Sequence, residues 1–528
     1  MAERYQVVIV GGGPVGLGLA VDLGQRGISV ALIEKNLAPI RIPKGQGLTA
    51  RTMEHFHFWR VEEEIRASRL LPRSYPIGGL TAYGNLMSEY WYTQEGGAGR
   101  GWGFEFFFGR NERLPQYITE EVLRNRLTGL PSVTPLFGWT AERVEQDDHG
   151  VRVFASEAGW SSPVELEAEY LVGCDGGRSI VRDMLSIDRA GADFDQRMVL
   201  AVFRSKELHE GLKRFPERTT YRVLKPELQG YWQFFGRVDV GEGWFFHAPV
   251  PRETNRSNFD FLGLLREAAG FEFDAEFDHV GFWDLRISVA ERYQGSRTFI
   301  AGDAAHTHPP YGGYGLNTGL EDVTNLGWKL AAALNGWGGD ALLASYTLER
   351  QPIFVETGQA MIEGGIEKDR AFLNRYNPAR DREEFEEAWN SRRSEREQSS
   401  YEPHYEGSIV VEGPPGGVCS IHGTHSLAVR PGHHLSPRML STGRDVFDEL
   451  GPDFTLLAFG SNERDIQTLE AAATSVGVPL TTIRDSFQED RTAYDARLIL
   501  VRPDQYVAWS GNEPPADSAA LMKKVAGQ

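Results

Sequence analysis

Short apolar runs alternate with a helical pattern through the first part of the chain. Residues 5–10 form an apolar run that predicts a buried strand, residues 16–26 predict a helix, and residues 29–34 predict a second strand ending in an acid. A strand, a helix and a strand in this order are typical of a βαβ unit with parallel strands. This part of the chain therefore predicts an α/β domain.

Two later apolar strands are each followed by an acid and glycines. Residues 170–174 predict a strand before Asp175, and residues 298–301 predict a buried strand before the loop 302–317. A long helical pattern follows that loop, with apolar positions at Leu320, Val323, Leu326, Leu330 and Leu334. Both stretches predict strand–turn–helix connections of the same α/β domain.

Between these two strands the pattern becomes one of short aromatic strands. Residues 219–224, 231–238 and 244–250 are separated by turn-rich pieces and predict an antiparallel sheet, which would offer a broad face to an aromatic substrate. For any single aromatic residue here, a place in the core is an equally good interpretation. The Gly- and aromatic-rich stretch 75–109 predicts part of the same second layer.

Three other segments complete the predicted elements. Residues 119–130 predict a helix, and residues 140–147 and 151–156 predict a hairpin around a turn at 148–150. Residues 366–407 are charged and predict a solvated helix pair or a linker. A smaller α/β unit follows from Gly432 onward, with strands at 454–459, 480–483, 496–501 and 506–509 and a helix at 465–476.

Composition and charge narrow the function classes. The chain has 528 residues, enough for two to four domains, and its 41% hydrophobic and 24% charged residues are normal for a globular protein. The formal net charge of −19 argues against nucleic acid or an anionic membrane as the main partner. No signal peptide and no apolar run of about 18 residues is found. We therefore expect a soluble, cytoplasmic protein without a membrane segment.

The cysteines point to no metal centre or disulfide framework. Only Cys174 and Cys419 occur, without a C-x-x-C pair and without the Cys/His spacing of a metal site. We therefore expect no metal, and a reducing compartment is consistent with so few cysteines.

The first βαβ unit carries a dinucleotide fingerprint. Gly11 would make the tight turn, Gly13 would let the backbone approach a pyrophosphate, and Gly16 would allow close packing of helix on strand. Glu34, eighteen residues beyond Gly16, is placed for a ribose hydroxyl, and its charge favours FAD or NAD over NADP. The alternative, a purely structural glycine turn, is weak because strand, helix and distal acid are all present.

The loop 302–317 has the composition of a second ligand-binding turn. Asp303 at the strand end can accept hydrogen bonds from ribityl or ribose hydroxyls, and the glycines let the backbone approach a flat ring. The following helix start offers free N–H groups and the positive end of a dipole. An ordinary strand–loop–helix connection is the alternative for this loop alone.

Arg51, just before a helix, is a further candidate. Its guanidinium could neutralise a phosphate or contact a flavin, with a surface ion pair as the alternative.

These motifs, in this order, resemble the single-component FAD-dependent aromatic hydroxylases, the p-hydroxybenzoate hydroxylase-like and phenol hydroxylase-like group A flavoprotein monooxygenases. The residues that carry the resemblance are Gly11–Gly16 with Glu34, Cys174-Asp175-Gly176, and Gly302 through Asn317. The tail from Arg430 resembles the thioredoxin-like C-terminal domain of many such enzymes. Without a C-x-x-C it is expected to serve packing or a dimer contact rather than redox chemistry.

The resemblance implies an α/β fold with three parts. A Rossmann-like (GR2-type) FAD-binding domain is expected at 1–74, 106–185 and 286–400, with an inserted antiparallel-sheet substrate-binding domain at 75–105 and 186–285. A linker and a thioredoxin-like domain are expected at 401–528.

The resemblance also implies a set of cofactor-binding positions, by transfer to the matching residues. They are Gly11, Gly13, Pro14, Val15, Gly16, Glu34, Lys35, Arg51, Gln116, Val144, Asp175, Gly302, Asp303, Pro310, Gly313, Gly315, Leu316 and Asn317. Asp175 belongs to a motif shared between FAD and the visiting NADH or NADPH, and Pro309 to Asn317 would lie beside the flavin ring.

Two positions depart from the family pattern. Tyr314 stands where Gln or Arg is common between the loop glycines, which would alter contacts to the flavin ring. Phenol hydroxylase-type members carry an acid in a Gly-Gln-x-Asp-Gly stretch, thought to help ionise the phenol, whereas this chain has Gly45-Gln46-Gly47. The substrate base is therefore not identified by the resemblance.

In this family NAD(P)H reduces FAD, O₂ adds to form a flavin C4a-hydroperoxide, and its distal oxygen attacks an activated aromatic ring. The resemblance therefore implies hydroxylation of a phenolic substrate, either a small hydroxybenzoate or resorcinol-like phenol or a polyketide-type aromatic. The aromatic stretch Tyr83–Phe108 favours a compact planar phenol. A phenol has a pKa of about 10, so it needs a base or a positive field to ionise at neutral pH. Arg286, Tyr221 and His247 are the candidates, each with a structural role as the alternative.

Two other function classes remain open from the sequence. An FAD-dependent reductase or dehydrogenase that does not activate O₂ would share the nucleotide motifs, and would show no substrate-coupled oxygen uptake. A flavin-binding interaction protein would not need the ring-side loop Pro309–Asn317. The expected partners are a small aromatic substrate and O₂, with a homodimer or higher homo-oligomer as a further expectation.

Overall fold

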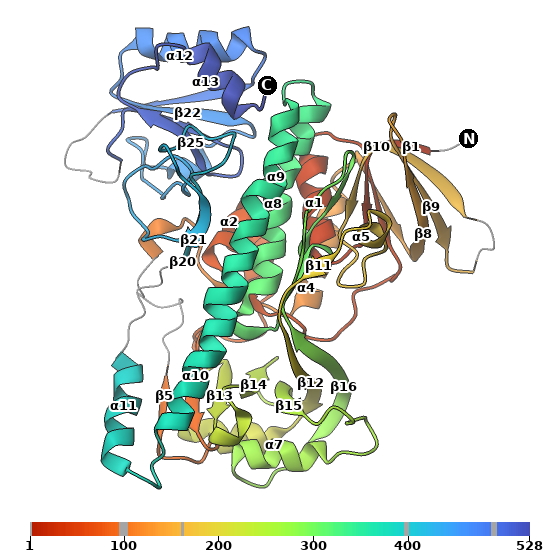
Figure 1. Cartoon of the computed structure of the whole chain (residues 1–528), viewed down its shortest axis with the longest axis vertical. Coiled ribbons are helices and arrows are strands. Elements are labelled where there is room, and N and C mark those ends of the chain that lie inside the picture. The colour runs from red at the N-terminus through yellow and green to blue at the C-terminus, as the bar shows by residue number, and fades with distance from the viewer. Residues whose placement is uncertain (1–2, 94–103, 160–162, 395–400, 487–493) are drawn as a thin grey trace.

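The protein is described by a computed structural model that covers residues 3–93, 104–159, 163–394, 401–486 and 494–528. Three units are visible in Figure 1: a mixed α/β unit with the N-terminus, a second sheet below it, and a C-terminal unit packed beside the long helices α8 and α9. Part of the aromatic stretch used above, residues 94–103, lies outside the described residues.

The first sheet contains five parallel strands in the order that a dinucleotide-binding fold requires. Along the sheet, hydrogen-bonded neighbours follow the chain order third, second, first, fourth and fifth. The strands in that spatial order are β7 (Val133–Phe137), β2 (Val30–Glu34), β1 (Glu3–Val10), β10 (Val164–Gly173) and β18 (Thr298–Ile300). The predicted parallel α/β unit is confirmed.

An antiparallel hairpin extends this sheet. β8 (Trp139–Gln146) and β9 (Val151–Glu157) pair with each other, and β9 pairs with the first half of β10. Because the second half of β10 pairs instead with β18, one strand serves both the hairpin and the parallel core. The predicted hairpin is confirmed.

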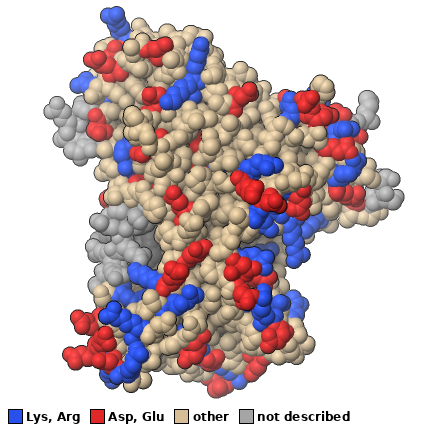
Figure 2. Space-filling view, viewed as in Figure 1, with Lys and Arg blue, Asp and Glu red and all other residues tan. Residues whose placement is uncertain are grey.

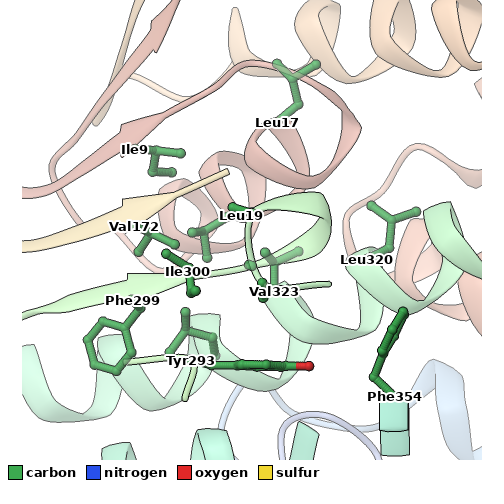
Figure 3. Packing of buried hydrophobic residues seen from close by; sticks show 14 of the residues in the cluster. Ile9, Leu17, Leu19, Val172, Tyr293, Phe299, Ile300, Leu320, Val323 and Phe354 are labelled. Carbon is green, nitrogen blue, oxygen red and sulfur yellow. The ribbon is translucent and has the colours of Figure 1, made fainter. Parts of the chain in front are cut away.

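Two helices cover the parallel strands and close the main core. α1 (Pro14–Gln25) and α8 (Tyr314–Leu334) pack on each other over the sheet. Figure 3 shows Leu19 of α1 and Val323 of α8 beside Val172 and Ile300 of adjacent strands; all four side chains are fully buried. Burial of side chains of this size stabilises the fold by roughly 1.5–3 kcal/mol each.

The second sheet has seven strands and holds the three predicted aromatic strands in its middle. Its order is β16 (Glu276–Arg286), β12 (Asp193–Arg204), β15 (Gly243–Val250), β14 (Gln233–Arg237), β13 (Thr220–Leu224), β4 (Gly79–Tyr83) and β5 (Trp91–Thr93). All pairs are antiparallel except β13 with β4. The two long strands β12 and β16 were not predicted individually.

The two faces of this sheet differ in their surroundings. One face packs a separate hydrophobic core against α7 (Phe261–Ala269), with Tyr221, Phe235, Trp244 and Phe246 among its buried members. The other face turns toward the first unit and contributes Met198, Trp232 and Leu285 to the main core. Because side chains alternate along a strand, each strand supplies both faces.

A nearly continuous helical column runs the length of the molecule (Figure 1). It consists of α9 (Asp340–Glu356), a π-helical turn η6 (Thr357–Glu363) and α10 (Gly364–Arg375), and α11 (Arg382–Ser394) folds back beside it. Phe385 and Trp389 of α11 are buried among rings of Tyr83, Tyr92 and Phe372. The predicted helix pair is confirmed by α10 and α11, whose charged positions are mostly exposed, and a buried aromatic stripe also anchors the pair to the second sheet.

The C-terminal unit contains a four-stranded sheet in the order β23 (Leu480–Asp485), β22 (Phe454–Phe459), β24 (Leu498–Val501) and β25 (Val507–Gly511). Helices α12 (Glu463–Ser475) and α13 (Ser518–Val525) pack on it. Trp328 of α8 belongs to the same buried cluster, so this unit is packed directly on the first one. The predicted small α/β unit is confirmed.

Shorter elements connect these units. They are β3 (Gly47–Leu48), α2 (Ala50–Phe58), α3 (Glu62–Ala67), β6 (Glu112–Arg113), α4 (Gln116–Leu127), α5 (Ile180–Met184), β11 (Arg189–Ala190), α6 (Lys206–Gly211), β17 (Ser288–Ala290), β19 (His306–Thr307), β20 (Tyr401–Tyr405) and β21 (Cys419–His422). Of these, α4 begins three residues before its predicted start.

On the face seen in Figure 2, basic and acidic side chains are interspersed. Among the described helices, none is both long enough and apolar enough to cross a bilayer.

Candidate functional site

The turn from β1 to α1 has the backbone that the glycine fingerprint predicts. Gly11 has φ of +105°, and a Cβ there would lie 2.3 Å from the Cys174 carbonyl oxygen. A Cβ on Gly16 would lie 1.9 Å from the Gly11 carbonyl oxygen, whereas a Cβ on Gly13 would have no atom within 4 Å. Gly11 and Gly16 are therefore required by the fold, while Gly13 borders open space that a ligand can approach.

The same turn faces the loop that follows β18. Pro14 is the first residue of α1, and Val15 beside it approaches the Gly302 backbone, where a Cβ would lie 3.0 Å from the Val15 side chain. Gly319 of α8 meets both residues. The two predicted ligand-binding turns are thus adjacent in space.

Glu34 ends β2 beside the glycine turn. Its Oε2 accepts a hydrogen bond from the Gly12 N–H (2.8 Å), and its Oε1 accepts from the backbone and side-chain amides of Asn36 (2.8 and 2.6 Å). Lys35 is exposed next to it. The carboxylate is therefore held at the edge of the turn, as a ribose contact requires.

Asp175 lies where β10 ends, next to β1. Its Oδ2 accepts from the Ile180 N–H (2.8 Å), while its buried Oδ1 has no hydrogen-bond partner among the described residues. Burial raises the pKa of this carboxyl above its ordinary value. An unsatisfied buried acceptor is a mark of a missing ligand or water.

Asp303 lies on the one-turn helix η4 (Gly302–Ala304), and a buried network positions this turn. The Gly302 N–H (3.1 Å) and His306 Nε2 (2.6 Å) both contact Asp322 Oδ2, and Arg350 Nε donates to Asp322 Oδ1 (2.9 Å). The Asp303 side chain is exposed and receives no hydrogen bond within the described part of the chain. Desolvation by the surrounding protein raises the pKa of this carboxyl, while His306 and Lys44 oppose the shift.

The ring-side loop ends in two left-handed glycines. Gly312 (φ +70°) and Gly313 (φ +74°) are exposed, and the Pro310 carbonyl accepts from the Gly313 N–H at 3.3 Å. α8 begins at the next residue, and a Cβ on Gly315 in its first turn would lie 3.6 Å from His308. A 21-residue helix therefore presents its N-terminal N–H groups behind an uncovered backbone.

Asn317 ties the first turn of α8 to the segment 45–49. Its Nδ2 donates to the Gly47 carbonyl (2.9 Å), and its Oδ1 accepts from the Thr49 N–H (3.0 Å). Leu316 and the Gln116 side chain both approach Gly45, whose carbonyl accepts from the Gln116 N–H at 2.8 Å. These residues, far apart in sequence, therefore lie against one another at the start of α8.

Two predicted cofactor residues have side chains that are largely engaged by the protein itself. Arg51 is held by Glu54 and Glu321 in a mostly buried ion-pair network, and it also borders a cavity that Gly312 and Asn317 line. The Val144 side chain is buried in the core of the β8–β9 hairpin, so only its backbone could contact a ligand.

The remaining positions fit a flavin dinucleotide. The open space at Gly13 suits a pyrophosphate, and the exposed Asp303 carboxylate and the unpaired Asp175 oxygen suit hydroxyl groups. Gly313, where a Cβ would meet no atom within 4 Å, leaves room for a flat ring, whereas the Tyr314 ring already packs against Gly312.

Comparison with known proteins decides which family this is. The family described as FAD binding domain matches residues 4–360, and the family described as aromatic-ring hydroxylase, C-terminal, matches residues 428–528. The chain belongs to the FAD-dependent aromatic-ring hydroxylases.

Similar proteins span almost the whole chain. The 12-dehydrotetracycline 5-monooxygenase/anhydrotetracycline 6-monooxygenase of Streptomyces rimosus subsp. rimosus is 31% identical, over 96% of this chain and 95% of that protein. The 4-methyl-5-nitrocatechol 5-monooxygenase of Burkholderia sp. is 29% identical, over 98% and 96%. The structure of aklavinone-11 hydroxylase with FAD and aklavinone superposes with a TM-score of 0.80 at 25% identity, over 100% of each chain.

These findings confirm the predicted enzyme class. This hydroxylase is an FAD-dependent monooxygenase of aromatic substrates, and the predicted mixed α/β FAD-binding fold with a C-terminal domain is confirmed. The reductase and the interaction-protein alternatives are not supported, because the relatives are monooxygenases over their full length.

The second sheet of the hydroxylase presents a row of rings toward the FAD-binding unit. We define this aromatic face as Trp232, Phe234, Phe245, His247 and Trp283. Successive ring centroids are 4.9, 5.9, 5.7 and 5.8 Å apart. The Tyr311 ring of the ring-side loop lies 4.1 Å from the Trp232 ring, so the row continues to the flavin side.

Of the three predicted substrate residues, only His247 lies on this face. Burial lowers its pKa to about 4, so it is neutral near pH 7 and would act as a hydrogen-bonding group. Tyr221 is buried in the opposite core, where its hydroxyl accepts from Arg237 Nη2 (3.0 Å). Arg286 is exposed at the end of β16 and pairs with Asp193 and Asp284. Strand alternation turns both away from the aromatic face, which corrects those two assignments.

Arg113 was missed by sequence reasoning. It is buried beside the aromatic face, 5.8 Å from the centre of the Phe245 ring, and β6 pairs it with Gly47. No carboxylate of the described residues forms an ion pair with it, and its Nε has no hydrogen-bond partner there. Burial, with a smaller contribution from the nearby Arg69 cation, lowers its pKa to about 10. A single arginine has no recognisable motif in the sequence. Arg113 becomes a candidate substrate-site residue only because the fold buries it beside the aromatic face.

Two cavities meet at Gly312. The smaller, about 230 Å³, lies between β13, Trp232, Tyr311 and the helices α10 and α11. The larger, about 380 Å³, lies between α2, the first turns of α8 and the segment around Tyr401 and His425. No residue of the second sheet lines the larger cavity.

Within the described residues, one cluster of possible metal ligands occurs outside this region. Ligand atoms of His404, Glu406 and His433 lie within 4.8 Å of one another. Both nitrogens of His433 already contact Glu402 and Glu406 at 2.9 Å, and the two imidazole rings are stacked at 4.5 Å. Stacked rings do not direct their nitrogens to one centre, so we assign no metal here.

Proposed function

We propose that this hydroxylase uses NADH or NADPH and O₂ to hydroxylate a phenolic aromatic substrate that lies on the aromatic face. The Tyr311–Trp232 contact carries this proposal, because it joins the ring-side loop to the row of rings at 4.1 Å. Overall, one oxygen atom enters the ring and the other leaves as water, with NAD(P)H supplying the two electrons.

We infer that the cofactor residues act in three groups. Gly11, Gly13 and Gly16 with the N-terminus of α1 hold the pyrophosphate, and Glu34 binds the adenosine ribose. Asp175 and Asp303 accept hydrogen bonds from ribityl or ribose hydroxyls. The bound FAD would supply the two-electron reduction and the oxygen activation.

The loop around the flavin ring would then protect the reaction. Gly312 and Gly313 let the backbone lie against the ring, and Asn317 fixes the segment 45–49 against the same helix. The aromatic side chains of Tyr311 and Trp232 would exclude water from the reacting atoms. Tyr314, the departure from the family pattern, lies in the first turn of α8 and lines the larger cavity.

The acid that helps to ionise the phenol in related enzymes is missing at Gly45–Gly47. Arg113 would instead favour the ionised phenol through its positive charge. A buried cation without an acid favours any oxygen that gains negative charge beside it. It would therefore lower the pKa of a phenol placed on the aromatic face and make the ring more nucleophilic. Trp283 Nε1, which has no partner among the described residues, is a second donor on that face.

The domain division is also part of the proposal. We take 1–74, 106–185 and 286–400 as the FAD-binding domain, 75–105 and 186–285 as the substrate domain, and 401–528 as linker and thioredoxin-like domain. The order β23-β22-β24-β25, with one parallel and two antiparallel pairs, supports the last assignment. A cytoplasmic location and a homo-oligomeric state remain predictions.

The test is NAD(P)H oxidation by the purified yellow protein across a panel of phenols, with oxygen uptake and peroxide recorded together. We expect one class of phenol to accelerate oxidation with little peroxide and to yield a product heavier by one oxygen. Oxidation that no phenol accelerates, or that consumes no oxygen, would refute the proposed reaction.

The location of the substrate needs a separate test. Trp232→Leu should weaken binding of the productive phenol, measured from the perturbation of the flavin spectrum. The control is Tyr401→Leu in the larger cavity, which should leave that affinity unchanged. The reverse result would move the substrate to the larger cavity.

A further inference from the structure

The smaller cavity borders the aromatic face and the ring-side loop but differs from both in charge. Trp232, Tyr311 and Tyr92 form its aromatic wall, and Met361 and Ile362 come from the π-helical turn η6. π-Helical turns are rare and are often found at functional sites. At about 230 Å³ the cavity is too small for a whole multi-ring substrate, but it can take one ring or one substituent.

Four charged side chains are found among the described residues that line this cavity: Arg222, Lys368, Asp369 and Arg392. These described residues are three cations and one carboxylate, with a formal sum of +2. Asp369 is shared, because Arg222 Nη1 contacts its Oδ2 at 3.2 Å and Arg392 pairs with its Oδ1. One carboxylate therefore serves two guanidinium groups.

Arg222 is oriented for a further anion. Its Nε donates to Thr81 Oγ1 (3.2 Å) and its Nη1 to Asp369, which leaves Nη2 without a hydrogen bond within the described residues. Its side chain is 22% exposed and that of Arg392 is 13% exposed, so both are partly removed from water. A carboxylate would form shorter and stronger bonds with such donors than a neutral hydroxyl would.

The charged side chains of the smaller cavity lie next to residues of the aromatic face and of the ring-side loop. Trp232 and Tyr311 line the cavity and also connect the aromatic face to the ring-side loop. A planar substrate lying on the aromatic face could therefore extend a substituent past Trp232 toward Arg222 and Arg392.

From this arrangement we propose that the smaller cavity binds a carboxylate substituent of the aromatic substrate, with Arg222 and Arg392 as its direct partners and Lys368 at the exposed mouth. The substrate class is thus an aromatic hydroxy acid rather than a neutral phenol. This inference rests on the proposed hydroxylation, and it adds a specificity site to it.

The experiment compares pairs of ligands that differ only in a carboxylate. Suitable pairs are 2,4-dihydroxybenzoate with resorcinol, and 1-hydroxy-2-naphthoate with 1-naphthol. Dissociation constants are measured on the FAD-loaded enzyme from the perturbation of the flavin spectrum. In at least one pair we expect the acid to bind about tenfold more tightly than the neutral ligand, as one charge-assisted hydrogen bond would give.

Substitutions then locate the preference. Arg222→Gln and Arg392→Gln should each abolish most of the tenfold preference, while the affinity for the neutral ligand changes less than twofold. Arg382→Gln is the matched control, because Arg382 lies on the same helix as Arg392 but is exposed and pairs with Glu386. Arg222→Lys should restore part of the preference.

Asp369→Asn distinguishes a binding site from a structural ion-pair cluster. Removing the carboxylate charge of Asp369, the one carboxylate among the described lining residues, should tighten binding of the acid if the cavity is an anion site. If the cluster only holds α10 and α11 to the sheet, this variant should weaken both ligands equally and lower the melting temperature.

The outcomes separate this inference from the proposed function. Neutral ligands that bind as tightly as their acids, with turnover intact, would overturn the carboxylate site and leave the hydroxylase reaction standing. A preference for the acid that survives both arginine substitutions would also overturn it. If no ligand of any pair binds or accelerates NAD(P)H oxidation, both proposals fail together.

Discussion

The guanidinium of Arg51 and the carboxylate of Glu321 form a two-point ion pair between α2 and α8, with Nε 3.1 Å from Oε2 and Nη2 3.3 Å from Oε1. The same guanidinium donates to the Asp504 carbonyl (2.6 Å) and to Gln505 Oε1 (2.8 Å) in the C-terminal unit. Burial alone would raise the pKa of Glu321, but Arg51 and His55 hold it well below its ordinary value. One side chain thus links the FAD-binding unit to the C-terminal unit.

Arg51→Met should destabilise the enzyme by roughly 3–5 kcal/mol, because it removes the guanidinium that the buried Glu321 and Glu54 carboxylates share. The C-terminal unit should also become more sensitive to protease than the rest of the chain. Denaturant unfolding and limited proteolysis measure both effects. The control is Arg41→Met, since Arg41 forms an exposed pair with Glu121. Normal stability with loss of FAD alone would instead return Arg51 to a cofactor role.

Gly11 and Gly13 should respond differently to alanine. Gly11→Ala places a Cβ in contact with the Cys174 carbonyl at a φ of +105°, so it should lower the melting temperature of the apoprotein. Gly13→Ala meets no atom within 4 Å and should fold normally, yet bind FAD more weakly because the methyl group occupies the ligand's space. Melting curves with and without FAD test this contrast. Equal loss of apoprotein stability in both variants would contradict it.

Asp303→Asn should weaken FAD binding about tenfold or more, because a carboxylate accepts hydrogen bonds from hydroxyl groups more strongly than an amide does. The apoprotein should keep its stability, since no described residue donates to that carboxylate. FAD content and affinity are read from flavin absorbance and fluorescence. Asp183→Asn, an exposed carboxylate on α5, serves as the control. Full FAD retention with normal turnover would refute the assignment.

His247 should make the enzyme less stable in acid. Its pKa is about 4 in the folded protein and 6.5 as the ordinary value, so the unfolded chain binds more protons between these values. The corresponding stability is present above pH 6.5 and is lost as the pH falls through about 4, by roughly 3 kcal/mol at most. His247→Gln should flatten this part of the stability profile, whereas the exposed His149→Gln should not. Parallel profiles for both variants and the natural chain would contradict the prediction.

Arg113→Met should separate activity from stability. Replacing an unpaired buried cation by an apolar chain of similar length should leave stability unchanged or raise it. The rate of hydroxylation should fall at least tenfold at neutral pH and recover partly at higher pH, where the phenol ionises without help. The pH dependence of kcat provides the readout. A loss of activity that is equal at all pH values would argue for a positioning role only.

Much of the FAD-binding unit was predictable because its signals are local. The spacing of Gly11, Gly13 and Gly16 and the acid at Glu34 follow from what a tight turn and a nearby pyrophosphate require of the backbone. Apolar runs and turn residues were enough to predict the hairpin, the aromatic strands and the C-terminal α/β unit. The charged stretch 366–407 predicted the helix pair correctly but not its anchoring, because the buried Phe385 and Trp389 are few among many charges.

The sequence by itself determined the cofactor class and the order of the nucleotide-binding turns, since each depends on residues within one short segment. Only the tertiary structure decided which side chains face the substrate. Tyr221, Arg286 and His247 are equivalent as candidates in the sequence, but strand alternation places only His247 on the aromatic face. Arg51 and Arg113 are both arginines in short elements, and only their neighbours distinguish them: two carboxylates pair with one, and none of the described carboxylates pairs with the other. The burial and the ion pairs of these side chains depend on residues far away in the sequence. They are therefore determined only by the folded structure.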